Sequence, residues 1–327
     1  MRNSSFETLR ILAVMLIIAM HILGYIDHAY LSPTNKVVLE VVNIIGNTGV
    51  SCFVLISGYF GVKYNTHKFL YLVIMSSIYS VLVVYLNDGI CPKELIKAFL
   101  IIPRYKLWFI VCYLFLMLLS PYLNQLADTL EKKDFSRLIA IMTILLCVIP
   151  TVFAEAAWSS VILHQGGKNL TYFLFLYLLG RYIKKYYDNN YSRIKLYSIH
   201  LLSSIVIAVV AIFTDILLVD DCSIFILVSS LALFFFFKSF CFHSRLINYI
   251  SSSVLAIYVL NWIYIYIDRE FIHLQGYASS NSFAVYLLAE VVAVSLIALV
   301  IDKFVGTFVN KVMIGIENKF NTIRHNS

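Results

Sequence analysis

The chain carries unusually little charge. Only 13% of its 327 residues are Asp, Glu, Lys or Arg, about half of the roughly 25% found in soluble domains. Hydrophobic residues make up 61% of the sequence and include 24 Phe and 23 Tyr. A water-soluble core cannot enclose that much apolar surface. The composition therefore excludes a soluble protein and predicts a polytopic membrane protein embedded in the lipid bilayer.

The sequence also lacks internal repeats, low-complexity linkers and any loop long enough for a soluble domain. No small-x-small cleavage site follows the first apolar stretch, so we expect a retained helix and not a removed signal peptide. The six cysteines show no spacing typical of a metal site, and no metal is expected. These absences predict a single integral-membrane domain covering residues 1–327.

Long apolar runs are the dominant feature that is present. A helix needs about 20 mostly apolar residues to cross the hydrocarbon. The resulting fold class is an all-α polytopic membrane protein with about ten transmembrane helices. The candidate spans lie roughly at 8–27, 39–61, 68–87, 107–126, 136–154, 170–187, 195–219, 223–241, 248–268 and 283–305.

The basic residues are distributed unevenly between the two sides. If the N-terminus lies in the cytoplasm, 18 of the 25 Lys and Arg residues fall on inner segments and 7 on outer ones. This asymmetry predicts an even number of spans with both termini cytoplasmic. The net charge of +7 is then a topology signal spread over several inner segments. It gives no indication of nucleic-acid binding, and we expect a multi-pass protein of the cytoplasmic, or inner, membrane.

The stretch FETLRILAVMLIIAMH, residues 6–21, leads into the first predicted span and contains three ionisable residues. Arg10 and His21 are 11 positions apart, about three turns plus 20°, so they share one helix face roughly 16 Å apart along the axis. Glu7 lies one turn before Arg10 on nearly the same face. We interpret this polar edge as lining a shared cavity, because ionisable groups in a span usually mark a site. The alternatives are an interfacial anchor for Arg10 and a helix-packing role for His21.

Small and polar residues crowd the second span, GNTGVSCFVLISGYFG at 46–61, which includes Asn47 and Ser57. Such a face either packs closely on other helices or lines a cavity, and the sequence leaves both open. Trp108 opens the fourth span, where it also fits an interfacial aromatic belt. Asn261 is a polar group in the middle of the ninth span.

Taken in order, these motifs resemble membrane acyltransferase family 3, the bacterial O-acetyltransferases that modify surface polysaccharides. FETLRILAVMLIIAMH is similar to the family's first-helix signature: an acid, an arginine three residues on, ten apolar residues and a histidine. Later elements are also similar: GVSCFVLISGYF (49–60), LWFIVCYLFLMLLSPYLNQL (107–126), FLFLYLLGRYI (173–183) and SSSVLAIYVLN (251–261).

Two positions depart from the pattern. The segment VKYNTHKF, 62–69, offers Lys63, His67 and Lys68 where many members have an arginine pair. Asn261 stands where many members have a histidine. Any role that depends on those positions has to be carried by the residues present here.

The resemblance implies an O-acyltransferase. It would move an acyl group, with acetyl expected, from cytoplasmic acyl-CoA (acetyl-CoA) to a hydroxyl of a cell-surface polysaccharide or its lipid-linked glycan precursor. Arg10, Lys63 and Lys68 are the expected contacts of the anionic donor. His21 is expected to be either the general base or a covalent acyl carrier, and Glu7 to orient Arg10.

The remaining substrate-binding candidates are Ser57, Asn47, Trp108 and Asn261, with Ser57 or Asn261 as a donor to the developing oxyanion. The alternative function is a multi-pass polysaccharide exporter or small-molecule transporter without acyl-transfer chemistry. Transporters often show two related halves. No such halves are evident in the sequence, and the polar groups concentrate in the first two spans, which favours the enzyme.

Overall fold

The computed structural model describes residues 3–100, 107–153, 166–187, 191–213 and 220–315. Within these ranges the regular structure is helical, which confirms the all-α prediction. The longer helices are α1 (Ser4–Leu23), α2 (Pro33–Phe60), α3 (Thr66–Asp88), α4 (Pro92–Phe99), α5 (Trp108–Thr129), α6 (Lys132–Thr143), α9 (Leu170–Tyr186), α10 (Arg193–Phe213), α11 (Ile224–Lys238) and α15 (Phe283–Ile301). The shorter elements are η1 (His28–Tyr30), η3 (Ile144–Val148), α7 (Ile149–Val152), α12 (Arg245–Ser251), α13 (Val254–Leu260), η4 (Asn261–Ile263), α14 (Tyr264–Ile267), η5 (Asp268–Ile272), η6 (Leu274–Tyr277) and η7 (Asp302–Gly306).

Six helical segments of the described chain are long and apolar enough to cross a membrane: Ser4–Leu23, Pro33–Phe60, Thr66–Asp88, Trp108–Thr129, Lys132–Val152 and Phe283–Gly315. A bent pair, Arg245–Ser251 with Val254–Ile272, would make a seventh. The molecule is therefore a multi-span membrane protein. Ten spans with both termini cytoplasmic stay a prediction. Residues 154 and 214–219 of the predicted spans lie outside the described residues.

Several spans differ in extent from their predictions: the second begins at Pro33 and was predicted from 39, and the last continues to Gly315 and was predicted to end at 305. The first helix begins at Ser4, ahead of the predicted 8, because the Asn3 side chain caps it by accepting from the Ser5 amide. The ninth span, predicted as one helix over 248–268, is bent by 43° between α12 and α13. At this break the Ser252 hydroxyl donates to the Tyr249 carbonyl. Serine hydroxyls compete for backbone groups in this way and weaken a helix locally.

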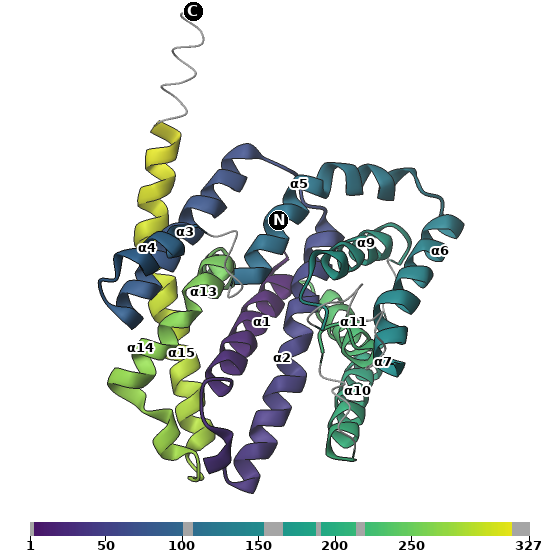
Figure 1. Cartoon of the computed structure of the whole chain (residues 1–327). Helices are drawn as coiled ribbons and strands as arrows, with labels where there is room; N and C mark the ends of the chain where they lie inside the picture. Colours follow the sequence, from purple (N-terminus) through teal and green to yellow (C-terminus); the bar gives the residue numbers. More distant parts are fainter. Residues whose placement is uncertain (1–2, 101–106, 154–165, 188–190, 214–219, 316–327) are drawn as a thin grey trace, which may run out of the picture.

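Helix α1 occupies the middle of the bundle (Figure 1), where it contacts α2, α11, α12, α13 and α15. Its contact with α2 is close because glycines face it. A Cβ on Gly49 would lie 3.1 Å from the carbonyl oxygen of Ala13, and one on Gly46 would overlap the Met20 side chain. The small residues of the second span therefore serve helix packing.

The same span packs tightly against α9 on its other side. A Cβ added at Gly58 would lie 2.2 Å from the carbonyl oxygen of Tyr177. One added at Gly180 would lie 2.5 Å from the carbonyl oxygen of Leu55. Glycine at both positions lets the two backbones approach each other, and this fixes α2 between α1 and α9.

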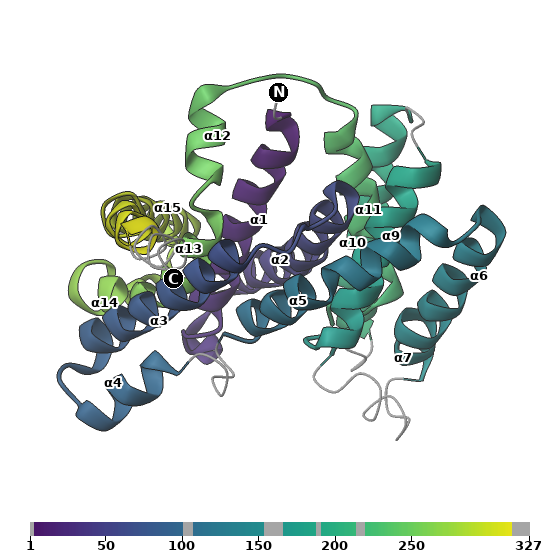
Figure 2. The ribbon, with the colours of Figure 1, turned by 90° about the horizontal axis from the view of Figure 1, so that it is seen from above.

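Residues 239–244, between α11 and α12, arch over the beginning of α1 (Figure 2). The Ser4 amide donates to the Phe242 carbonyl at 2.9 Å, and the Asn3 side chain donates to the Phe240 carbonyl at 3.1 Å. The Ser4 hydroxyl also donates to Asn248 Oδ1 at 3.0 Å. The first bond satisfies a backbone amide that has no intrahelical partner, and all three bonds anchor the turn of α1 that precedes Arg10.

Candidate functional site

Glu7 and Arg10 form an ion pair one turn into α1. Arg10 Nη1 donates to both Glu7 oxygens, at 3.1 and 3.3 Å. The Glu7 side chain is only 4% exposed, whereas that of Arg10 is 21% exposed. A carboxylate in the first turn is favoured by the helix dipole. The hydrogen bonds from Arg10 to Glu7 are those that an orienting role for Glu7 requires. They leave part of the guanidinium accessible.

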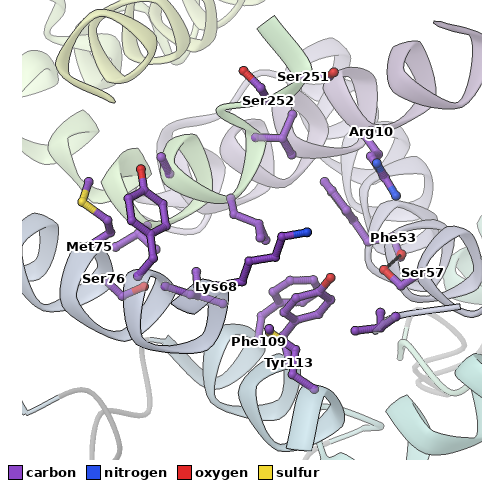
Figure 3. A pocket seen from close by; sticks show the side chains of 18 of the residues that line it. Arg10, Phe53, Ser57, Lys68, Met75, Ser76, Phe109, Tyr113, Ser251 and Ser252 are labelled. Atoms are coloured by element: carbon purple, nitrogen blue, oxygen red, sulfur yellow. Dashed lines mark hydrogen bonds between the residues drawn. The ribbon is translucent and has the colours of Figure 1, made fainter. Parts of the chain in front are cut away.

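Arg10 lines a cavity of about 630 Å³ between α1, α2, α3, α5 and α13. The cavity brings Arg10 together with the other two predicted donor contacts, Lys63 and Lys68. Lys68 extends from α3 across the cavity toward Arg10 (Figure 3). Within the described chain, neither lysine ammonium has a salt-bridge partner. The three cationic groups outnumber the two nearby carboxylates, Glu7 and Asp302, which makes this cavity suitable for an anionic ligand.

The other walls of the cavity are mostly apolar and aromatic. They include Phe53, Phe109, Tyr113 and Met117, with the hydroxyls of Ser251 and Ser252 at one edge (Figure 3). Asp302 also lines the cavity, and it accepts a hydrogen bond of 2.7 Å from the Tyr79 hydroxyl. The arrangement suits a ligand that has an anionic end and a long, weakly polar body.

A closed set of hydrogen bonds holds the loop that carries Lys63. The Val62 amide donates to the Tyr177 hydroxyl at 2.9 Å, and Asn124 Nδ2 donates to the Val62 carbonyl at 2.8 Å. The Tyr177 hydroxyl in turn donates to Asn124 Oδ1 at 2.7 Å. Sequence reasoning missed Asn124 and Tyr177; the available signal was an asparagine near the end of an otherwise apolar helix.

His21 lies in the last turn of α1, at the end opposite Arg10, and its side chain contacts two residues of η4. Its Nδ1 lies 3.0 Å from Asn261 Oδ1, and its ring stacks on Trp262 with centroids 5.0 Å apart. The amide nitrogen of Asn261 is already bonded to the Tyr258 carbonyl, so the oxygen faces the imidazole and Nδ1 is the donor. In the neutral ring the free lone pair then lies on Nε2.

Asn261, predicted as a substrate contact, makes its hydrogen bonds inside the protein. It is fully buried, and both ends of its amide are engaged by His21 and Tyr258. Its contacts are those of a group that orients the histidine. Ser57 does line the cavity, but its hydroxyl donates to the Phe53 carbonyl at 2.9 Å. The Ser57 oxygen therefore has acceptor capacity left but no spare proton for an oxyanion.

Asn47 and Trp108 are not brought to the cavity. Asn47 is buried on α2 and is not among the lining residues. Trp108 packs edge-on against Phe109 and Phe173, with ring centroids 6.0 and 5.7 Å apart. Trp108 thus stabilises the start of α5 through aromatic contacts.

The cavity approaches His21 without including it. Its lining extends along α13 to Val259, two residues before Asn261, and His21 is not part of it. Helix α13 therefore connects the cationic cavity to the group that holds the imidazole. A continuous slot from Arg10 to His21 stays a prediction.

Comparison with known proteins gives one match. A family model described as an acyltransferase domain matches residues 3–302 of the chain. No curated protein and no solved structure matches the chain. The match includes α1 with Arg10 and His21, the loop with Lys63, the start of α3 with Lys68, and the η4 turn with Asn261. The chain therefore belongs to acyltransferase family 3, and it is a membrane acyltransferase.

Proposed function

We propose that the protein transfers an acetyl group from cytoplasmic acetyl-CoA to a hydroxyl of a cell-surface polysaccharide or its lipid-linked precursor, in the cytoplasmic membrane. The observation that carries the proposal is the cavity lined by Arg10, Lys63 and Lys68. Acyl-CoA combines several phosphate charges with a long, weakly polar pantetheine arm. The cationic side and the apolar walls of this cavity match those two parts.

The three cations would act differently on the donor. The guanidinium of Arg10, held by Glu7, can bind a phosphate through two parallel hydrogen bonds. Lys63 and Lys68 are exposed and act as point charges. Binding of the donor should therefore weaken as salt is added, because exposed charges are screened. The uncharged arm would extend along the apolar walls toward α13.

His21 is the group best suited to the acyl-transfer step. In the direct route, Nε2 takes the proton of the acceptor hydroxyl as the oxygen attacks the thioester carbonyl carbon. The C–O bond forms, the C–S bond breaks, and His21 returns the proton to the departing sulfur. The products are an acetyl ester and free CoA thiol. General base catalysis of this kind contributes about 10²–10⁴-fold in rate.

The covalent route uses the same nitrogen. Nε2 would attack the thioester carbonyl carbon first, forming an acyl-imidazolium and expelling the CoA thiolate. The acceptor hydroxyl would then attack the acyl carbon, the C–N bond would break to restore the neutral imidazole, and the hydroxyl proton would pass to the thiolate. Both routes need Nδ1 to be held and Nε2 to be free. The Asn261 contact supports that requirement.

The test compares surface polysaccharide from cells with and without the gene by mass spectrometry and NMR. Loss of an ester group from an otherwise normal polymer would support the proposal. Loss of exported polymer, with ester groups intact on internal material, would instead assign the protein to export and overturn the proposal. Purified protein with labelled acetyl-CoA and de-esterified polymer then tests transfer directly, with His21→Ala as the inactive control.

A further inference from the structure

A second polar cluster lies where α9 and α11 begin, away from the cationic cavity. Asp221 is 1% exposed and Ser223 is 3% exposed. Among the described residues, neither the two carboxylate oxygens of Asp221 nor the hydroxyl of Ser223 has a hydrogen-bond partner. Leaving buried polar groups unpaired is costly. Two such groups within three residues indicate a place where a ligand supplies the missing hydrogen bonds.

The backbone holds this cluster in place. The Ser223 amide donates to the Asp220 carbonyl at 2.9 Å, and the Cys222 amide donates to the Gly166 carbonyl at 3.4 Å. Gly167 has φ of +91°, and a Cβ there would lie 2.8 Å from the Cys222 side chain. The two loops are therefore in direct contact, and this contact holds Asp221 inside the protein.

The cluster lies close to the catalytic histidine of the proposed reaction. The exposed side chain of Lys168 is near enough to His21 and to Asp221 to interact electrostatically with both. Asp221 also interacts with Tyr258, whose carbonyl accepts the amide of Asn261. Through Lys168 and Tyr258, Asp221 is therefore linked electrostatically to the surroundings of His21, near the end of α1 remote from the cationic cavity.

Burial raises the pKa of Asp221 to about 7, with the charge of Lys168 opposing the rise and Asp220 adding to it. Near neutral pH the group therefore exchanges readily between a hydrogen-bond acceptor and a donor. A metal ion is a poor occupant, because Lys168 is positively charged. In addition, the described residues contain no group of three or more His, Cys, Asp or Glu able to hold a metal.

We propose that Asp221, Ser223 and Lys168 form the subsite for the acceptor, and that they recognise the hydroxyl groups of a carbohydrate. This inference rests on the proposed acyl transfer. Sugar hydroxyls can donate hydrogen bonds to the unpartnered oxygens of Asp221 and Ser223. The oxygens of a sugar can in turn accept from the Lys168 ammonium. The donor would then approach His21 from the Arg10 end of α1, and the acceptor from the other end.

The test uses the full-length protein and oligosaccharides prepared from the surface polysaccharide of cells lacking the gene. Asp221→Asn keeps the size of the side chain and removes the charged acceptor. We expect the KM for the oligosaccharide to rise about 10–100-fold, as for loss of a hydrogen bond to a charged group, with the KM for acetyl-CoA unchanged. Asp134→Asn is the matched control, because Asp134 is 56% exposed on α6; it should change neither constant.

A second variant and a direct binding measurement make the result decisive. Ser223→Ala should raise the same KM by a smaller factor. If both variants keep the wild-type KM for the oligosaccharide, the subsite assignment is wrong. Binding of the oligosaccharide to wild-type protein without donor should also be lost in Asp221→Asn. If binding behaves this way but no acetyl group is transferred, the proposed function fails and the carbohydrate subsite stands.

Discussion

His21 and Asn261 are 240 residues apart in the sequence and are joined by a hydrogen bond of 3.0 Å between Nδ1 and Oδ1. Because the Asn261 amide nitrogen donates to the Tyr258 carbonyl, the amide oxygen is the atom that faces His21, and an amide oxygen can only accept. The bond therefore selects the tautomer in which Nε2 is unprotonated. This pair decides which nitrogen of His21 is free to act.

Replacement of Asn261 tests this orienting role. Asn261→Ala should lower kcat about 10–100-fold, because the imidazole loses its fixed tautomer and orientation. Asn261→Asp keeps an oxygen that accepts from Nδ1 and should retain most of the activity. The measurement is kcat with acetyl-CoA and de-esterified polymer. Equal losses in the two variants would indicate a packing role for Asn261 instead.

Removal of the imidazole should stop the reaction. His21→Ala should reduce acyl transfer by about 10²–10⁴-fold or more, with unchanged protein level and membrane insertion, because His21 is partly exposed near the end of α1. The readout is ester content of the surface polymer together with the amount of protein in membranes. Fully esterified polymer from His21→Ala cells would show that the base is another group.

The donor site is tested at Arg10. Arg10→Lys keeps the positive charge but loses the planar two-pronged contact with phosphate. We expect the apparent KM for acetyl-CoA to rise about tenfold, with a smaller effect on kcat. Arg137→Lys is the matched control, since Arg137 is 64% exposed on α6 and outside the cavity. A KM for acetyl-CoA that stays at the wild-type value in Arg10→Lys would move the donor away from this cavity.

The contact between α2 and α9 depends on Gly58. Gly58→Ala would place a methyl group 2.2 Å from the Tyr177 carbonyl oxygen, and such overpacking costs about 1–3 kcal/mol. Thermal unfolding of detergent-solubilised protein should show a lower Tm. Gly276→Ala is the control, because no atom lies within 4 Å of the added Cβ. The same Tm in both variants would mean that the helices separate without cost.

Stability should depend on pH through Asp221. Its pKa of about 7 in the folded protein lies above its ordinary value of 3.8, so the folded state binds the proton more tightly. The resulting stabilisation is complete below about pH 4 and is lost as pH rises through about 7. Asp221→Asn carries no such charge, so its Tm relative to wild type should increase between pH 5 and pH 8. The charged neighbours, Asp220 and Lys168, stay in both proteins, and a Tm difference that does not vary with pH would contradict the burial of an ionisable Asp221.

Hydropathy, charge distribution and helical period determined much of this protein from the sequence alone. They gave the membrane class, the helical fold and the one-turn pairing of Glu7 with Arg10, because each of these depends on residues close together in the chain. A cavity shared by Arg10 and His21 stays a prediction. The motif order also indicated the family. Helix ends were less accurate, since a capping side chain such as that of Asn3 starts α1 before its apolar run.

Tertiary structure alone decided which distant residues meet. Asn261 reaches His21, Tyr177 and Asn124 fix the loop before Lys63, and helices from both halves of the chain enclose one cavity. No local pattern encodes these contacts, because they depend on how closely helices approach and on which polar groups remain unpaired after packing. The same reason explains the burial of Asp221. An aspartate in a loop is normally exposed to solvent, and only the contact between two loops buries this one.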